Sequence, residues 1–323
     1  MMVKKEFLRG VLTLECKDVF KKRILLPPSR FRILDYPRKP VAVFNPGAVI
    51  VEDEIHIFPR LIFDYYKYTS SIGHFKIGLK ELLEENFPDV IDVEIIMWPK
   101  SREDLLGVED PRAHTFENEI WILYTAKGFD KSSYERKDYL GFAKYNFNEV
   151  KRVGYFAIDM GNGPFFPKSN KDSTFLEING NETRILTRPH FADDELSLWA
   201  GKADLENLVI TDLKRVKRPL KHEEKLGWST NSVKVDEKWI IGWHAVVKSD
   251  LSYRNGFAVI NKNDFKFTDY KLCPNGLLEE YGDRALVIFG CGLISIEDNL
   301  IWVGGVSDYA IGIFIADRSV VLS

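Results

Sequence analysis

Apolar stretches separated by short polar turns recur along the whole chain. Five segments share one pattern, in which a first strand, a turn of Asp, Asn, Glu or Gly, and a second strand of bulky apolar residues follow one another. They cover residues 45–58, 110–124, 172–186, 230–243 and 292–303. These turn residues tolerate the tight backbone of a hairpin, and short apolar runs on both sides of a turn are typical of paired strands. The pattern therefore predicts five β-hairpins.

The hairpins recur at a nearly constant interval of 65, 62, 57 and 61 residues. The equivalent turn positions are Asp53, Asn118, Gly180, Glu237 and Asp298. A further strand that contains glycine follows each hairpin, so each unit has at least three strands and room for a fourth. One such sheet cannot bury both of its faces, whereas a closed ring of sheets buries all of them. We therefore expect an all-β fold, a five-bladed β-propeller that forms a single domain over residues 1–323, with an irregular β-sandwich as the alternative.

Helical patterns are sparse. In residues 77–87 the apolar side chains Leu79, Leu82, Leu83 and Phe87 recur near helical spacing, and Pro88 ends the segment. The pattern predicts a short helical insertion between two strands of the propeller.

Composition narrows the range of partners and cofactors. The 323 residues are 45% hydrophobic and 29% charged, with a net charge of −3, which gives no general attraction to nucleic acid or to anionic membranes. No apolar stretch approaches the ~18 residues of a membrane span, and the first residues lack the apolar core of a signal peptide. The three cysteines, Cys16, Cys273 and Cys291, form no CxxC pair and argue against a disulfide framework. These features predict a cytoplasmic protein.

Polar residues recur at the ends of otherwise apolar strands. The first strand of successive units begins near Asn45, Asp110, Asp172 and Lys225, and the second strands end at Arg60, Arg188, His244 and Asp308. Any single one of these groups is explained as a solvated strand end. Because polar residues stand at equivalent positions in successive units, we expect them to share a pocket at the mouth of the central channel, where propellers bind their ligands.

The segment GVEDPR at 107–112, followed by a hairpin that ends in Tyr124-Thr125-Ala126, resembles the signature of glycoside hydrolase family 130. This family contains mannoside phosphorylases and some mannosidases, all built on five-bladed propellers. Further segments that resemble the family follow in order along almost the whole chain. They are residues 44–49 and 58–60, 170–172 and 187–189, 225–227 and 242–246, and 304–308.

The resemblance implies inverting phosphorolysis of β-mannosides to α-mannose 1-phosphate. Asp110 matches the catalytic acid of the family, which is thought to protonate the glycosidic oxygen through a sugar hydroxyl while inorganic phosphate attacks the opposite face. The positions that match the family's phosphate site are Lys171, Lys225, His244 and Tyr253. A phosphorylase needs such cations because its nucleophile is already an anion.

Other polar residues at the strand ends are candidates for binding sugar hydroxyls. They are Asn45, Arg60, Glu109, Arg112, Asp172, Arg188 and Asp308. For Arg112 an internal salt bridge that orients Asp110 is an equally good interpretation. The sequence has no HExxH motif, no His pair at i, i+4 and no Asp-rich calcium loop, so we expect no metal and no cofactor besides phosphate as co-substrate.

Two other functions remain open. A β-mannosidase on the same scaffold would need a second carboxylate as base, for which Glu177, Glu279 and Glu280 are available. A propeller that binds glycans without catalysing a reaction is the third possibility.

Residues 174–177 and 228–231 depart from the family pattern, which leaves the acceptor sugar open, together with the choice among β-1,2, β-1,4 and mannosyl-glucose linkages. Symmetric homo-oligomers are common, and residues 77–90 and the termini are candidate contacts.

Overall fold

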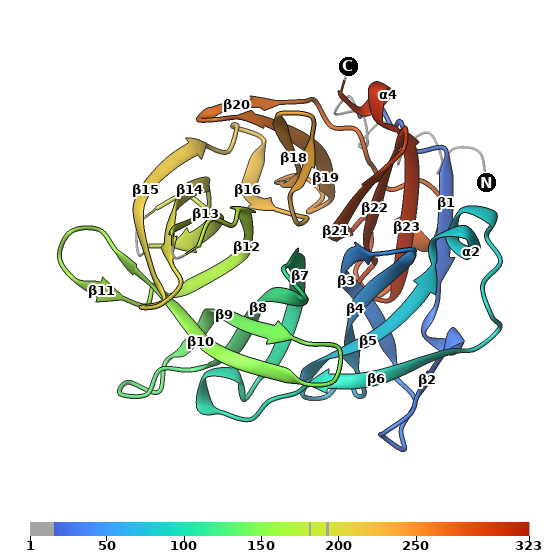
Figure 1. Cartoon of the computed structure of the whole chain (residues 1–323), viewed down its shortest axis with the longest axis horizontal. Coiled ribbons are helices and arrows are strands. Elements are labelled where there is room, and N and C mark those ends of the chain that lie inside the picture. The colour runs from blue at the N-terminus through green and yellow to red at the C-terminus, as the bar shows by residue number, and fades with distance from the viewer. Residues whose placement is uncertain (1–15, 181, 192–193, 323) are drawn as a thin grey trace.

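The computed structural model describes residues 16–180, 182–191 and 194–322, and within them the strands form blades around a central axis (Figure 1). The first blade contains β3 (Ala42–Val51), β4 (Glu54–Ile62), β5 (Ser70–Gly78) and β6 (Ile91–Met97). The second contains β7 (Gly107–Phe116), β8 (Glu119–Phe129), β9 (Arg136–Tyr145) and β10 (Val150–Asp159). The third contains β12 (Ser169–Glu177), β13 (Glu182–His190), β14 (Leu198–Asp204) and β15 (Val209–Lys217). The predicted five-bladed propeller is confirmed, and the β-sandwich is excluded.

The fourth blade contains β16 (Glu223–Trp228) and β17 (Val233–Val235), which both pair with β18 (Lys238–Val247), followed by β19 (Tyr253–Asn261) and β20 (Asp264–Phe267). The fifth contains β21 (Ile288–Ile296), β22 (Asn299–Val306) and β23 (Ala310–Asp317). Smaller elements are the strands β2 (Phe31–Ile33) and β11 (Pro164–Phe165), the 3₁₀ turns at Pro28–Arg30 and Arg102–Asp104, and the helices α2 (Leu79–Glu84), α3 (Leu277–Glu280) and α4 (Arg318–Leu322). No helix within the described residues is long and apolar enough to cross a membrane.

All five predicted hairpins are present as antiparallel pairs. Each turn places one residue in the left-handed region of backbone space, with φ between 48° and 56°. These residues are Glu52, Glu117, Gly180, Asp236 and Glu297. The predicted helix over 77–87 is shorter in the structure, because β5 continues to Gly78, which pairs with Glu54, and α2 begins only at Leu79.

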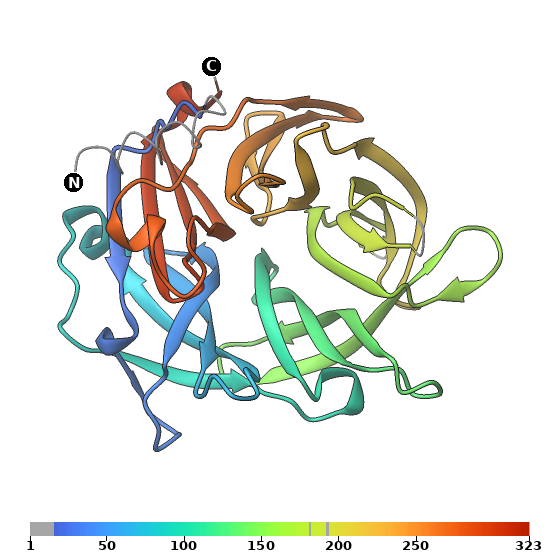
Figure 2. The ribbon, with the colours of Figure 1, turned by 180° about the vertical axis from the view of Figure 1, so that it is seen from behind.

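The ring is closed by strand β1 (Lys22–Leu26), which pairs antiparallel with β23 and supplies the fourth strand of the last blade. Figure 2 shows this blue first strand beside the red last blade. Just before β1, backbone hydrogen bonds join Lys17 to Tyr270 and Val19 to Lys271. In the same place a disulfide joins Cys16 to Cys273, with the two Cα atoms 6.4 Å apart. The sequence argument missed this bridge, because only ring closure brings together residues 257 positions apart.

Packing between the fourth and fifth blades depends on Trp302, whose side chain is fully buried. Its indole lies against two glycines, Gly242 of β18 and Gly290 of β21, and a Cβ atom on either would overlap the ring. The ring of Phe257 contacts the same indole edge-on, with 5.5 Å between ring centroids. The two glycines are therefore required by the volume of one tryptophan.

We expect Gly242→Ala to lower the free energy of unfolding by about 1–3 kcal/mol, because the added methyl group overpacks a filled core. Urea denaturation measures this difference. In a Trp302→Phe background the smaller ring leaves room for the methyl group, so the same substitution should cost less there. Strictly additive effects of the two substitutions would contradict the packing argument.

Candidate active site

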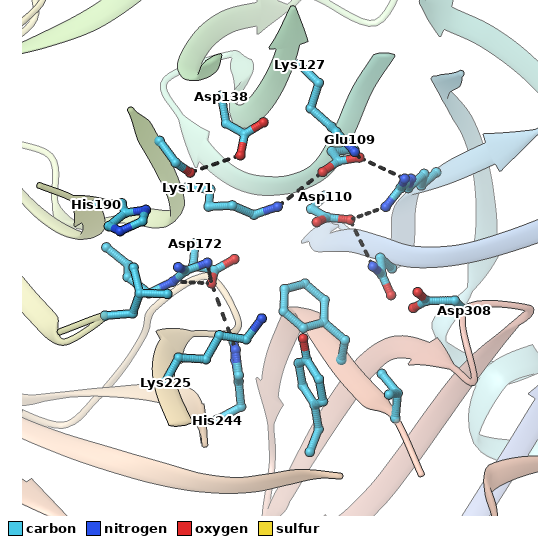
Figure 3. A pocket seen from close by; sticks show the side chains of 18 of the residues that line it. Glu109, Asp110, Lys127, Asp138, Lys171, Asp172, His190, Lys225, His244 and Asp308 are labelled. Carbon is cyan, nitrogen blue, oxygen red and sulfur yellow. Dashed lines mark hydrogen bonds and ion pairs between the residues drawn. The ribbon is translucent and has the colours of Figure 1, made fainter. Parts of the chain in front are cut away.

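A cavity of about 550 Å³ lies where the inner strands of the blades begin (Figure 3). Eleven of the twelve residues predicted from the sequence line it, and they come from all five blades. They are Asn45, Arg60, Glu109, Asp110, Lys171, Asp172, Arg188, Lys225, His244, Tyr253 and Asp308. The exception is Arg112, which lies beneath the cavity wall.

Three inner strands present a polar side chain to the cavity in the same way. Asn45 of β3, Asp110 of β7 and Asp172 of β12 each lie at a shift in strand register and have φ values of 46°, 53° and 51°. An extra residue at such a bulge turns its side chain out of the regular alternation of the strand. Asn and Asp tolerate this left-handed backbone better than most residues. The bulges therefore explain why these residue types recur at the start of the repeat.

Asp110 is nearly buried, with 4% of its surface exposed. Its Oδ1 accepts a hydrogen bond of 2.9 Å from Nδ2 of Asn45 and lies 3.5 Å from Nη1 of Arg60. Both partners come from the neighbouring first blade. One carboxylate oxygen is thus held in place, which fixes the orientation of the whole group toward the cavity.

Arg112 holds the backbone around Asp110 rather than facing the cavity. Its Nη1 donates to the carbonyl oxygen of Asp110 at 2.6 Å, and its Nε donates to the carbonyl oxygen of Ser229 at 2.8 Å. Its Nη2 lies 3.5 Å from Oδ1 of Asp172. Arg112 is therefore internal, but its ion pair is with Asp172 rather than with Asp110, whose backbone alone it contacts, and it does not line the cavity.

Glu109 is surrounded by three cations. Its carboxylate oxygens lie 2.7 Å from Arg60, 3.2 Å from Lys171 and 3.4 Å from Lys127. Burial alone would raise the pKa of Glu109, but the attraction of these cations outweighs it and lowers the pKa to about 2. Glu109 is therefore an anion at neutral pH and cannot act as the proton donor.

Asp172 and His244 meet beside Gly227. Arg188 donates to Oδ2 of Asp172 from Nε at 2.8 Å and also lies within 2.7 Å through Nη2. Burial would raise the pKa of Asp172, but Arg188, His244 and Arg112 together lower it. Nε2 of His244 is 3.9 Å from the same oxygen, and a Cβ atom at position 227 would overlap both groups. Glycine is thus required at a position whose role the sequence argument did not identify.

His244 and Tyr253 are neutral hydrogen-bonding groups. Burial lowers the pKa of His244 to about 3, although Asp172 acts in the opposite direction, and burial raises the pKa of Tyr253. The two rings stack with their centroids 5.0 Å apart. Nδ1 of His244 lies 2.9 Å from the hydroxyl of Ser229. If that hydroxyl donates, the ring proton sits on Nε2, on the side of Asp172.

Lys225 faces the cavity without a carboxylate partner in the described part of the chain, and Figure 3 shows its ammonium group near His244. Burial, followed by the repulsion of Arg188, lowers the pKa of Lys225 to about 8, although Asp172 acts in the opposite direction. Its Nζ lies 5.9 Å from the ring centroid of Tyr253. An ammonium group held in this way gains from the arrival of an anion.

The structure adds cavity residues that the sequence argument missed. They are Tyr68, Lys127, Arg136, Asp138, Lys168, Ser169, His190, Leu196, Arg284, Val287 and Phe289. Lys127 directly follows the Tyr124-Thr125-Ala126 motif and could have been found from it. Most of the others lie in loops or near strand ends, at positions where the repeated sequence pattern does not single out a residue. With them, eight Lys and Arg side chains and five carboxylates line the cavity, so its wall carries net positive charge.

Among the described residues there is no group of three or more His, Cys, Asp or Glu side chains that could hold a metal ion. Four of the five carboxylates of the cavity, those of Glu109, Asp110, Asp172 and Asp308, are instead close to Arg or Lys side chains, and Asp138 accepts a hydrogen bond from Ser169. The chemistry that this wall supports is proton donation combined with the binding of an anion.

Comparisons with known proteins agree with the fold. A beta-1,2-mannobiose phosphorylase from Thermoanaerobacter sp. (strain X514) is 24% identical over 300 residues, covering 86% of this chain and 90% of that protein. The beta-1,2-mannobiose phosphorylase from Listeria innocua, solved with beta-1,2-mannobiose, has the same fold with a TM-score of 0.70 at 17% identity, covering 92% and 96% of the two chains. A mannose phosphorylase from Leishmania mexicana, solved with a phosphate ion, has a TM-score of 0.58 at 16% identity, covering 97% and 91%.

The family model for glycoside hydrolase family 130, described as beta-1,4-mannooligosaccharide phosphorylase, matches residues 13–322. This match spans almost the entire chain and includes every residue of the cavity. The chain therefore belongs to glycoside hydrolase family 130.

Proposed function

We propose that this protein is an inverting phosphorylase that converts β-linked manno-oligosaccharides and inorganic phosphate into α-mannose 1-phosphate. The observation that carries the proposal is the convergence of Lys225, His244 and Tyr253 on the cavity that also contains Asp110. The curated relatives named for beta-1,2-mannobiose and 1,2-beta-oligomannan favour β-1,2 linkages as the first substrates to test.

Phosphate is the nucleophile that suits this wall. Lys225 supplies a positive charge at neutral pH, and the neutral His244 and the Tyr253 hydroxyl supply hydrogen-bond donors. Lys171 adds a second cation that is shared with Glu109. Such preorganised donors hold an anion next to the reacting carbon without the reorganisation that water would require.

Asp110 is the proposed proton donor. Its proton passes through a sugar hydroxyl to the glycosidic oxygen, the bond from the anomeric carbon to that oxygen breaks, and a phosphate oxygen forms the new bond on the opposite face. The proton carried by the phosphate then restores Asp110, so the acid returns to its starting state over one cycle. One displacement at the anomeric carbon inverts its configuration, which converts the β-mannoside into the α-phosphate.

The remaining predicted residues suit a sugar with several hydroxyl groups. Asn45, Asp172 and Asp308 offer amide and carboxylate groups at the cavity wall, and Arg60 and Arg188 offer guanidinium donors. Glu109 can accept a hydroxyl proton because it stays ionised. Direct contacts of these side chains with mannose are part of the proposal.

The single domain, the cytoplasmic location and assembly into a homo-oligomer stay predictions.

The carboxylates suggested as the base of a mannosidase lie elsewhere. Glu177 is exposed at the end of β12, beyond the cavity. Glu279 accepts hydrogen bonds from Arg23 and from the backbone of Asn275, and Glu280 accepts one from the backbone of Gly276. None of the three lines the cavity, which supports phosphorolysis over hydrolysis by this route.

Incubation with β-1,2-mannobiose or β-1,2-mannotriose should release α-mannose 1-phosphate only when phosphate is present. Asp110→Asn should lower kcat by about 100-fold or more, because general acid catalysis contributes at least this much. Asp236→Asn, an equally conservative change in an exposed left-handed turn, is the matched control and should retain full activity. Sugar release at the same rate without phosphate would instead identify a hydrolase, and full activity of Asp110→Asn would remove the proposed acid.

Lys225→Ala and His244→Ala should each raise the KM for phosphate by about tenfold or more, because a hydrogen bond to a charged group is worth roughly 1.5–3 kcal/mol. The KM for the mannoside should change much less. Lys266→Ala, which removes an exposed lysine of β20, serves as the control. Initial rates at varied phosphate and fixed sugar, then the reverse, separate the two effects. Equal increases in KM for phosphate and for the mannoside would contradict the assignment of Lys225 and His244 to the phosphate site.

Activity should depend on pH through Lys225. Because its pKa is lowered to about 8, the side chain loses its charge at a lower pH than an ordinary lysine would. We therefore expect kcat/KM for phosphate to fall as pH rises through about 8. Lys225→Arg keeps its charge throughout this range, so a pH–rate profile of this variant should lack the decline. The same decline in both proteins would assign it to another group.

A further inference from the structure

Strand β1 is the outer edge of the last blade (Figure 1). It pairs with β23 on one side, from Lys22 opposite Ile315 to Leu26 opposite Ile311, and pairs with no other strand of the described chain. Local opening begins where few contacts hold a segment, and an edge strand has hydrogen bonds to a neighbour on one side only. Detachment of β1 would open the ring, because this strand joins the beginning of the chain to its last blade.

The residues just before β1 lie across the seam between the fourth and fifth blades. Val19 and Phe20 are buried there. The ring of Phe20 lies 6.1 Å from that of Phe257 in β19 and 6.4 Å from that of Phe314 in β23, measured between centroids. The same short segment therefore packs against both blades, and its position depends on how they meet.

The disulfide between Cys16 and Cys273 gives this segment a second covalent anchor. Cys273 lies in the connection between β20 of the fourth blade and β21 of the fifth. With the bridge intact, residues 17–26 are attached covalently at both ends, to Cys273 and to the first blade. Without it, residues 17–21 are held to the rest of the described chain by noncovalent contacts and through β1 alone. The bridge closes a loop with a sequence separation of 257 residues, and long loops lose the most entropy on closure.

An ion pair makes the connection after Cys273 depend on β1 as well. Nη1 of Arg23 in β1 lies 2.5 Å from Oε2 of Glu279, and Nη2 of Arg23 donates to the carbonyl oxygen of Cys273 at 3.3 Å. Glu279 is buried and has no second cationic partner in the part of the chain that the structure describes. If β1 detached, a buried carboxylate would lose its partner, which is strongly destabilising. The same connection carries Arg284 and Val287, which line the catalytic cavity.

The bridge is accessible to a reductant. Cys16 is partly exposed, whereas the third cysteine, Cys291, is fully buried and burial raises its pKa, so it exchanges poorly. A thiolate of a dithiol attacks Sγ of Cys16, the bond between the two sulfur atoms breaks, and Cys273 leaves as a thiolate. The second thiol of the reductant then displaces Cys16, which leaves two protein thiols and one oxidised, cyclic dithiol.

We propose that the Cys16–Cys273 disulfide is a redox-sensitive latch on the closure of the ring. In the oxidised protein it holds β1 on the last blade, and its reduction by a dithiol lets β1 detach while the other blades stay folded. The predicted cytoplasmic location would expose the latch to thiol reductants. This inference concerns the fold and does not depend on the proposed phosphorylase activity.

The test is amide hydrogen exchange of the full chain, with and without excess dithiothreitol, followed by mass spectrometry. Thiol titration of the unfolded protein should count one free cysteine before reduction and three after it. Reduction should speed exchange in residues 22–26 and 311–315 by about tenfold or more, since disulfides that close long loops typically contribute more than this factor. Exchange in β7 and β8 of the second blade should not change.

Cys16→Ser should exchange as the reduced protein does, whether or not the reductant is present. Lys21→Ser, a change of an exposed side chain in the same segment, is the matched control and should keep the full response to dithiothreitol. Three free thiols before reduction, no change in exchange on complete reduction, or equal acceleration in all five blades would each overturn the latch. None of these measurements uses turnover, so their outcome is separate from that of the phosphorolysis assay.

Discussion

Charged side chains buried at the axis of this propeller are balanced by partners from neighbouring blades. Arg60 of the first blade contacts Glu109 and Asp110 of the second, and Lys171 of the third contacts Glu109. Arg112 of the second blade reaches Asp172 of the third and the backbone of the fourth. Removing one partner of a buried pair leaves a charge that is strongly destabilising. The positions of the blades and the charges of the cavity are therefore interdependent, and the site cannot be assembled from fewer blades.

These ion pairs also determine which charged groups of the cavity are neutralised and which are not. Glu109 and Asp172 are neutralised by fixed cations and have lowered pKa values, whereas Lys225 has no carboxylate partner within the described chain and a pKa near 8. The two carboxylates therefore stay ionised at neutral pH, whereas the ammonium group of Lys225 faces the cavity. This ammonium group has no counter-ion in the described chain, which favours an anionic nucleophile such as phosphate.

The sequence was sufficient for the parts of the fold that repeat. The interval of about 61 residues and the turn residues predicted five hairpins. The polar strand ends, together with the family resemblance, predicted eleven residues that line one cavity. For Arg112 the sequence left an internal and a sugar-binding position equally open, because strand alternation gives no information about which face a bulge exposes. Arg284 and Tyr68 lie in loops outside the repeat. The Cys16–Cys273 bridge depends on the closure of the ring, which no local pattern encodes.

Strand β1 completes the last blade, and this has a consequence for biosynthesis. The ribosome makes β1 long before its partner β23, so β1 has no partner while the strands between them are being translated. The contact order of this pairing is close to the maximum that the chain allows, and such distant pairings form slowly. Because Asp308 belongs to the blade that contains β23, nascent chains have no complete cavity until this blade has been synthesised.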